Sequence, residues 1–453
     1  MEHLLRVAAA HAADYRASLT DRPVRARLSG AELKAGFARP LGAAGRPASD
    51  VLADLVEAAD GGLVASAGPR YFGFVNGGSL PSATAAEIVA TGWDQNGWNG
   101  VLSPTAAAAE ETAGTWLKDV LGIPATASTG FVTGAQAGNT VGLAAARNHV
   151  LAQAGWDVER LGLAGAPRVR ILASEERHGT IDRSLRLLGF GTEAITPVRT
   201  DAQGALDIED LSQKLDPGNK GPLIVCLQAG NVNTGAVDPL EAAIALVRAY
   251  GGWTHIDGAF GLWAAASPRT KHLVKGLEGA DSWSCDGHKW LNLPYDSGFA
   301  FCAHPTSHAA AMSYRAPYLV GAGDVYELGD FTPESSRRAR GLAVWAGLQE
   351  LGRDGVTELV DRCCELARRF ADQLAAAGFE IGNDVVLNQV LVSYGDDATT
   401  DRVIEAVQRG GVCWMGGTTW HGRRYMRISV SNYLTTAADV DLSVEAITAA
   451  ASA

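Results

Sequence analysis

One lysine, Lys289, lies in the segment SWSCDGHKWLNLP, where most of its neighbours are aromatic, apolar or small. An ammonium group is costly to bury in such surroundings, so desolvation lowers the pKa of a lysine there and makes the neutral amine available as a nucleophile toward carbonyl groups. The alternative is a surface lysine whose aliphatic stem packs between hydrophobic residues. The segments upstream help to choose between these two interpretations.

An aspartate, Asp257, ends the apolar segment WTHID and is followed by GAFG. A carboxylate at the end of a buried strand points toward the crevice where open α/β sheets bind ligands. Pyridoxal phosphate (PLP) needs a carboxylate at its pyridine nitrogen, because a protonated ring is a better electron sink. The alternative is an aspartate that caps the next helix.

Two further segments carry groups that suit the same ligand. In FVTGAQAGNTVGL, small residues lead into a helix, whose N-terminal N–H groups and dipole favour a phosphate; these residues are Thr133, Gly134, Ala135 and Gln136. In SEERHGTIDRSLRLLG, His178 follows an apolar run, where an imidazole can stack on a planar ring or transfer a proton. Taken singly, each segment also fits an ordinary strand-to-helix turn or a structural histidine.

Near the C-terminus, Arg427 lies in RYMRISVSNYLTT and by alternation shares a strand face with Tyr425 and Ser429. A guanidinium group there can bind a substrate carboxylate through two parallel hydrogen bonds, although a surface arginine on an edge strand is the plainer interpretation. Glycine loop, histidine, aspartate and lysine follow one another in order on one α/β pattern. We therefore predict a PLP site at Lys289, and no metal site.

The elements that position these residues form an α/β pattern. Five apolar runs, at 168–174, 222–228, 253–258, 281–286 and 297–303, alternate with helical segments and indicate a mostly parallel sheet covered on both faces. Asp238 and Pro239 precede LEAAIALVRAYGG and predict a helix with Asp238 as its N-cap. We expect an N-terminal helical segment (1–60), a large PLP-binding domain (61–320) and a smaller α+β C-terminal domain (321–453).

Composition narrows the class of protein. The chain has 453 residues, of which 47% are hydrophobic and 19% charged, which supports large buried cores. A net charge of −12 without a basic stripe argues against nucleic acid. The six cysteines lack paired spacing, and the N-terminus lacks the features of a signal peptide, so we expect a cytoplasmic protein. The uncharged stretch 120–146 is interrupted by proline, glycine and amides, and no membrane span is expected.

At this point the sequence resembles the group II PLP-dependent amino-acid decarboxylases, which include the glutamate, aromatic-L-amino-acid and histidine decarboxylases. ADSWSCDGHKWLNLP is similar to the family's lysine motif, WTHIDGAFG to its aspartate segment, ERHGTIDRSLRLLG to its histidine helix, and GNVNTGAVDPL to its G-T-T loop. The resemblance implies PLP fold type I, the aspartate-aminotransferase-like fold. It also implies a homodimer with its active sites at the subunit interface.

Carried over by position, the resemblance assigns roles to individual residues. Lys289 holds PLP as a Schiff base, Asp257 pairs with the pyridine nitrogen, and His178 stacks on the ring. The remaining cofactor-binding residues are Thr133, Gly134, Ala135, Gln136, Ala259 and His288. Arg427 is similar to an arginine that binds the substrate carboxylate in some members, and the aromatic residues expected to line the substrate pocket are Tyr71, Phe74 and Trp98.

The chain departs from the family pattern in three places. The phosphate loop has Gln136 and Ala137 where the family has a hydroxyl residue and an acid, and Asn231 with Val232 replaces two threonines. In the family's mobile loop a tyrosine returns the proton, and a phenylalanine there favours oxidative aldehyde formation. Tyr326 lies in this loop but out of the family's register, and Phe331 is close by.

We therefore expect decarboxylation of an aromatic or bulky L-amino acid to an amine and CO₂, with Lys289 and His178 as catalytic residues and Tyr326 as the proton donor. One alternative is another PLP reaction, either a Cα–Cβ lyase or aldolase, or an oxidative decarboxylating aldehyde synthase. The other is a binding protein that keeps the fold without catalysis. The only partners expected are a small amino-acid substrate and a second copy of the chain.

Overall fold

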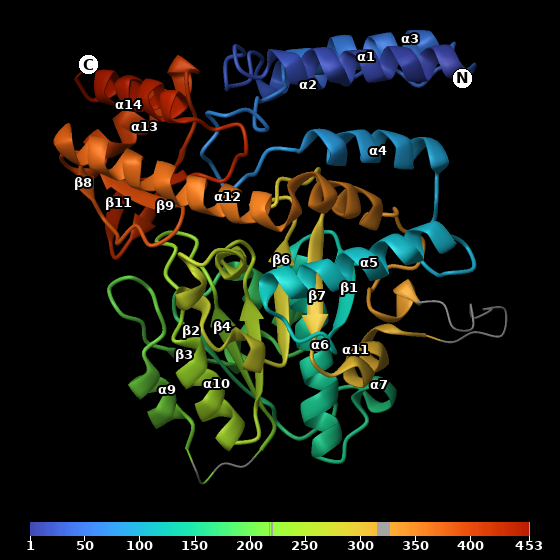
Figure 1. Ribbon diagram of the computed structural model, residues 1–453, viewed down its shortest axis with the longest axis vertical. Coiled ribbons are helices and arrows are strands. Elements are labelled where there is room, and N and C mark those ends of the chain that lie inside the picture. The colour runs from blue at the N-terminus through green and yellow to red at the C-terminus, as the bar shows by residue number, and fades with distance from the viewer. Residues whose placement is uncertain (217, 219–220, 315–326, 453) are drawn as a thin grey trace. The chain divides into compact units, whose positions relative to one another are not determined.

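The computed structural model describes residues 1–216, 218, 221–314 and 327–452 (Figure 1). The chain forms two compact units. Unit 1 contains Met1–Gly78, Arg369–Gly382 and Val390–Ala453, and unit 2 contains Ser79–Arg368 and Asn383–Gln389. No helix among the described residues is both long and apolar enough to cross a membrane.

The two units do not divide at residues 60 and 320. Residues 61–78 join unit 1 because they contact its C-terminal segments: Arg70 forms an ion pair with Asp439 at 3.1 Å, and Phe72 packs edge-on against Phe370. The second division falls between Arg368 and Arg369, inside the long helix α12 (Gly341–Ala376). It does not coincide with the break in this helix at Gly352, which has a positive φ of 60°.

Unit 2 is built on a seven-stranded sheet in the order β1-β7-β6-β5-β4-β2-β3. Its strands are β1 (Ser128–Val132), β2 (Arg170–Ser174), β3 (Ile195–Val198), β4 (Leu223–Gln228), β5 (Trp253–Asp257), β6 (Ser282–Asp286) and β7 (Gly298–Cys302). The five apolar runs of the sequence are β2, β4, β5, β6 and β7, which confirms that part of the prediction. Strands β3, β2, β4, β5 and β6 are parallel.

Strand β7 differs from the expected parallel arrangement. It runs antiparallel to both β6 and β1. The reason is its connection: residues 287–297 join β6 to β7 without the crossover helix that parallel neighbours require. This short connection contains Lys289, so the predicted nucleophile lies on the link between two paired strands.

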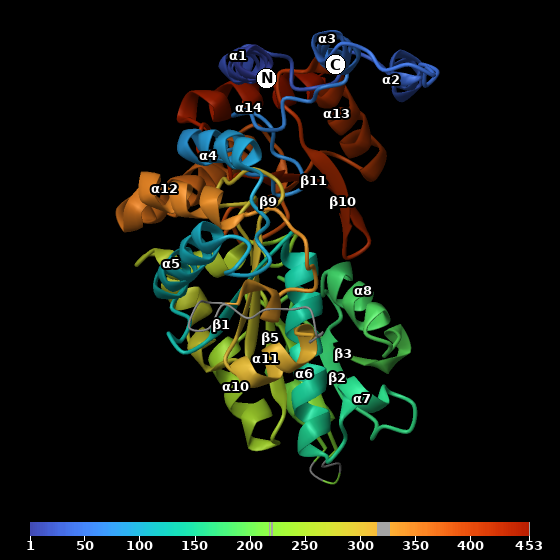
Figure 2. The same ribbon diagram turned by 90° about the vertical axis from the view of Figure 1, so that its right-hand side faces the viewer.

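Helices cover both faces of this sheet. The helices of unit 2 that precede α12 are α4 (Pro81–Trp93), which lies beyond the end of the sheet in Figure 1, α5 (Pro104–Leu121), α6 (Ala135–Gln153), α7 (Val158–Leu161), α8 (Gly179–Leu187), α9 (Ile208–Lys214), α10 (Leu240–Ala249) and α11 (Pro305–Met312). Short 3-10 turns are η1 (Thr192–Ala194), η2 (Gly261–Ala266), η3 (Lys271–Val274), η4 (Leu277–Gly279) and η5 (Leu328–Asp330). In Figure 2, α6 and α8 lie on one face and α5 and α10 on the other. Strands β4, β5 and β6 are buried throughout, as their continuous apolar sequences predict.

The helix at 240–249 forms as predicted, but its expected cap is wrong. The Asp238 carboxylate accepts N–H groups from Leu206 (2.8 Å) and Gln228 (2.7 Å), and the residue that precedes the helix is Pro239. Asp238 is buried, so its carboxylate serves two interior backbone donors in place of the helix end.

Unit 1 combines helices with a small sheet. Its helices are α1 (Glu2–Ser18), α2 (Gly30–Phe37), α3 (Ala48–Asp60), α13 (Asp397–Gly410) and α14 (Ala437–Ser452). Its sheet has the order β10-β11-β9-β8, formed by β10 (Gly416–Trp420), β11 (Arg423–Ser429), β9 (Gln389–Ser393) and β8 (Glu380–Ile381). This is the smaller α+β arrangement that the C-terminal sequence predicts.

Candidate active site

Lys289 lies just after β6, and its amine contacts a carboxylate. The Nζ atom is 2.9 Å from Oδ2 of Asp286, and the lysine side chain is 23% exposed while that of Asp286 is 3% exposed. The sequence predicts an apolar environment for the Lys289 amine, and this prediction is wrong, because the amine contacts the carboxylate of Asp286. Backbone hydrogen bonds from Gly287 and His288 to the Ser297 carbonyl hold the turn in place.

Asp286 joins three parts of unit 2. Besides Lys289, its Oδ1 accepts the N–H of Ala135 at 2.5 Å and lies 3.4 Å from Nε2 of His288. Burial lowers the pKa of His288, so this histidine is neutral near pH 7. The carboxylate therefore bridges the predicted nucleophile and the positive N-terminus of α6. Sequence reasoning gave Asp286 no role, although its i,i+3 spacing from Lys289 was a usable signal.

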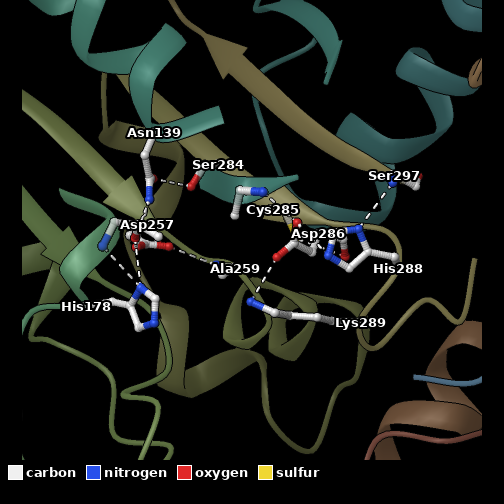
Figure 3. A network of polar contacts seen from close by, with 12 residues as sticks. Asn139, His178, Asp257, Ala259, Ser284, Cys285, Asp286, His288, Lys289 and Ser297 are labelled. Atoms are coloured by element: carbon white, nitrogen blue, oxygen red, sulfur yellow. Dashed lines mark hydrogen bonds and ion pairs between the residues drawn. The ribbon is translucent and has the colours of Figure 1, made fainter. Parts of the chain in front are cut away.

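Asp257 ends β5 and is almost fully buried. Its Oδ2 accepts the amide N–H of Asn139 (2.9 Å) and the hydroxyl of Thr180 (3.4 Å), and its Oδ1 accepts the N–H of Ala259 (3.2 Å) (Figure 3). The next helical turn, η2, has no side-chain cap, so Asp257 is not a helix cap. These three donors are neutral, and the two carboxylate oxygens have further lone pairs that can accept another N–H donor. Asn139 was missed, although it lies one helical turn after Ala135.

His178 lies at the entrance to α8 as its N-cap. Its Nδ1 is 2.9 Å from Oγ1 of Thr180 and accepts the Thr180 N–H at 3.3 Å, and Thr180 in turn contacts Asp257. The side chains of His178, Asp257 and Lys289 face one common region in Figure 3. The structure thus brings together the three residues to which the sequence gave the central roles, and stacking of His178 on a ring stays a prediction.

The glycine loop joins β1 to α6 at a point of close backbone approach. A Cβ atom at Gly134 would lie 3.0 Å from Cε1 of His288, and one at Gly298 would lie 2.4 Å from Cα of Gly134. The first helical N–H groups have no acceptor within α6, and Asp286 satisfies that of Ala135. The Gln136 side chain instead donates to Oγ of Ser184 on α8 at 2.9 Å. Phosphate binding by Thr133–Gln136 stays a prediction, carried by their backbone.

One buried donor near Asp257 has no acceptor. Gln228 is 6% exposed and pairs in register with Asp257 across β4 and β5, so both side chains lie on one face of the sheet. Within the described part of the chain, its Nε2 has no hydrogen-bond partner. Such orphaned donors are rare and indicate a missing partner. Gln228 is a second residue that sequence reasoning missed.

These groups fit PLP. The Lys289 amine suits its aldehyde, the Asp257 carboxylate suits its pyridine nitrogen, and the α6 N-terminus suits its phosphate. The orphaned Gln228 amide suits the oxygen on the ring. The fit rests on geometry within unit 2 alone.

Three residues predicted to bind substrate belong to unit 1. Tyr71 and Phe74 both stack on Trp414, with ring centroids 5.0 and 5.5 Å apart. Arg427 lies on β11, an inner strand of its sheet, and burial lowers its pKa, so it is not a surface arginine on an edge strand. Their contact with a substrate stays a prediction, and Trp414 joins the set as a residue that the sequence did not single out.

The remaining predictions concern the segment before α12. Trp98 stacks on Tyr314 with ring centroids 6.0 Å apart. Gly329 also lies against this indole, because a Cβ atom at Gly329 would be 2.4 Å from Nε1 of Trp98. Tyr326 lies outside the described residues. The carbonyl of Phe331 accepts a hydrogen bond from Nε2 of buried His308 (3.1 Å), so Phe331 serves as an anchor for the chain at this point.

The family comparison covers most of the chain. Residues 33–394 match the model of the pyridoxal-dependent decarboxylase conserved domain. Among curated relatives, phenylacetaldehyde synthase of a Rosa hybrid cultivar is 26% identical over 93% of this chain and 88% of its own. Aromatic-L-amino-acid decarboxylase of Bacillus atrophaeus is 28% identical over 74% of this chain and 70% of its own.

Solved structures show the same fold. The TDC of Oryza sativa, crystallised with PLP and tryptamine, superimposes with a TM-score of 0.92 at 23% identity and covers 100% of this chain and 97% of its own. Mouse CSAD superimposes with a TM-score of 0.91 at 22% identity and covers 99% and 98%. The match spans both compact units.

Proposed function

Because the chain belongs to the pyridoxal-dependent decarboxylase family, we propose that it converts an aromatic L-amino acid to the corresponding amine and CO₂. The observation that carries the proposal is the convergence of Lys289, Asp257 and the α6 N-terminus in one compact unit. The aromatic substrate class is supported by the named activities of relatives, which include a tryptophan decarboxylase of Oryza sativa and a tyrosine decarboxylase of Papaver somniferum.

In this proposal each residue acts on one atom or group. When bound, PLP would supply an electron sink for the α-carbon of the substrate. The Lys289 amine would hold the cofactor through its aldehyde group. The Asp257 carboxylate would accept the N–H of the protonated ring nitrogen, and the exposed ring of His178 would contact the cofactor. Tyr326 is our candidate for the acid that returns a proton to the α-carbon.

We further propose that substrate recognition involves residues of unit 1. Arg427 is a partly desolvated guanidinium group and suits the substrate carboxylate. The stacked rings of Tyr71, Phe74 and Trp414 offer an aromatic surface for the side chain. We propose Trp98 as a further residue that contacts the substrate.

Assembly and location complete the proposal. We propose a homodimer with the active site at its interface, supported by the exposed side chains of Phe74 (64%) and Trp93 (56%). A reducing cytoplasm is supported by the six cysteines, all of which are buried free thiols.

One experiment tests the reaction. Purified protein with PLP is incubated with L-tryptophan, L-tyrosine, L-phenylalanine and, as an acidic comparison, L-glutamate, while CO₂, amine, aldehyde and oxygen uptake are followed together. We expect CO₂ and amine from an aromatic substrate without oxygen uptake, and no product from a Lys289→Ala variant. Turnover of L-glutamate alone would refute the substrate class.

A second outcome has its own support. The relatives include aldehyde synthases from the Rosa hybrid cultivar, Rhodiola rosea and Petunia hybrida, and Phe331 lies close to Tyr326 in the sequence. Aldehyde with matching oxygen loss would assign the chain to that oxidative reaction.

A further inference from the structure

A chain of buried hydrogen bonds runs along one face of the sheet and ends at Asp257. Nε1 of Trp253 donates to Oγ of Ser282 at 2.9 Å, and that oxygen is 2.8 Å from Nδ1 of His255. Nε2 of His255 is 2.9 Å from Oδ1 of Asn139, whose Nδ2 donates to Asp257 at 2.9 Å. All five residues are at most 6% exposed.

The strand periodicity explains why these groups meet. Trp253, His255 and Asp257 alternate along β5, so their side chains share one face of the sheet. His255 pairs in register with Ser282 on β6. The helix α6 covers this face and supplies Asn139. One turn further along α6, a Cβ atom at Gly142 would lie 2.7 Å from Cε1 of His255, so only glycine admits the ring.

The direction of the hydrogen bonds follows from the Asp257 end. An ionised carboxylate only accepts, so the Asn139 amide must turn its NH₂ toward Asp257 and its oxygen toward His255. Oδ1 of Asn139 also accepts the Ser284 hydroxyl at 2.5 Å. His255 must then carry its proton on Nε2. Burial lowers the pKa of His255 to about 4, so a single proton on the ring is the state near pH 7.

The Trp253 end imposes the same direction independently. An indole N–H can only donate, so Oγ of Ser282 accepts from it and gives its own proton to Nδ1 of His255. The reverse direction, which would suit a protonated Asp257, directs two N–H donors at Oγ of Ser282 and leaves the hydroxyl proton without an acceptor among the residues that the structure describes. The Trp253 end therefore fixes the same hydrogen-bond direction that an ionised Asp257 requires.

We propose that His255 is a positioning residue that acts through Asn139: as the Nε2–H tautomer, held by Ser282 and Trp253, it fixes the Asn139 amide so that Asp257 stays an ionised acceptor for the protonated ring of the cofactor. His255 itself does not touch the cofactor in this arrangement. The inference rests on the PLP binding in the proposed function but not on the identity of the substrate.

The test compares three variants for PLP affinity and for the visible absorbance of the bound cofactor, which reports ring protonation. His255→Leu removes the donor to Asn139. His255→Gln keeps an N–H near the Nε2 position. His308→Leu is the matched control, because His308 is also buried and forms hydrogen bonds with Oγ of Ser128 (2.8 Å) and with the Phe331 carbonyl. None of its described hydrogen bonds involves Asp257.

We expect His255→Leu to weaken PLP binding by at least about tenfold and to change the absorbance spectrum, since it disturbs a hydrogen bond to a charged group. His255→Gln should restore both to within about threefold of the parent protein, and His308→Leu should leave both within that range while it lowers thermal stability. Equal PLP affinity and spectra for His255→Leu and His308→Leu would overturn the inference, as would a failure of His255→Gln to restore them.

The apoproteins are compared by circular dichroism before PLP is added. If His255→Leu fails to fold, Ser282→Ala replaces it, because this change leaves His255 without the donor that fixes its tautomer; an unchanged spectrum and affinity then overturn the inference. If the parent protein does not bind PLP, the proposed function itself fails, which is a separate result.

Discussion

The buried ion pair between Glu110 and Arg337 should control the stability of unit 2. The Nη atoms of Arg337 lie 3.0 and 2.8 Å from the two carboxylate oxygens, and both side chains are only 1% exposed. Arg337 also donates to the carbonyl of Phe131 on β1, two residues before Thr133. Glu110→Gln keeps the shape but leaves a buried guanidinium group without its counter-charge. Breaking such a pair costs about 3–5 kcal/mol.

The assay is thermal unfolding of the apoprotein at pH 7. Since a domain of this size loses about 2–4 °C in Tm for each kcal/mol, Glu110→Gln should lower Tm by about 6 °C or more. The control is Asp119→Asn, whose ion pair with Arg353 is 66% and 58% exposed and should contribute about 0–1 kcal/mol.

The double variant Glu110→Leu with Arg337→Met separates charge from packing. Replacing both partners by apolar groups removes the uncompensated charge, so much of the lost Tm should return. If Glu110→Gln lowers Tm no more than Asp119→Asn does, the reasoning from burial is refuted.

Three further predictions concern the same unit. Burial lowers the pKa of His308 from 6.5 to about 4, so between pH 4 and 6.5 the unfolded chain binds a proton that the folded chain does not. The free energy of unfolding should therefore fall by about 3 kcal/mol as the pH drops through this window. His308→Gln should flatten this part of the curve of Tm against pH, and an unchanged curve would contradict the prediction. Gly298→Ala should lower both Tm and PLP affinity, since its Cβ would lie 2.4 Å from Cα of Gly134, and parent-like values of both would show that the backbones can separate freely. Gln228→Leu should weaken PLP binding but not apoprotein stability, because it removes a buried donor that has no partner in the described structure; the opposite pattern would assign Gln228 to the core.

The sequence alone determined five of the seven strands of the unit 2 sheet, but not β1 and β3, and it determined the order of the chemical groups along them. Continuous apolar runs predict β2, β4, β5, β6 and β7, because strands buried on both faces need no polar alternation. The sequence therefore predicts that Asp257 lies at the end of a strand and that Lys289 follows the next strand. The motifs around them indicate the family, which the domain match confirms.

Only the tertiary structure decided what each polar group contacts. Asp238 reads as a helix cap, yet it accepts N–H groups from residues 10 and 32 positions away, because the sheet buries it beside them. Asp286 meets the N-terminus of α6, which lies 151 positions earlier in the chain. The antiparallel course of β7 depends on a connection too short for a crossover helix, and strand periodicity is the same for either direction.

The hydrogen-bond chain that ends at Asp257 also depends partly on the sequence and partly on the tertiary structure. Its members come from β5, β6 and α6, and their sequence separations of 27, 116 and 118 residues carry no local signal. A period of two places Trp253, His255 and Asp257 on one face, which the sequence does show. Which atoms donate and which accept is set by the packing of α6 on that face, because hydrogen-bond direction depends on the partners that folding brings within reach.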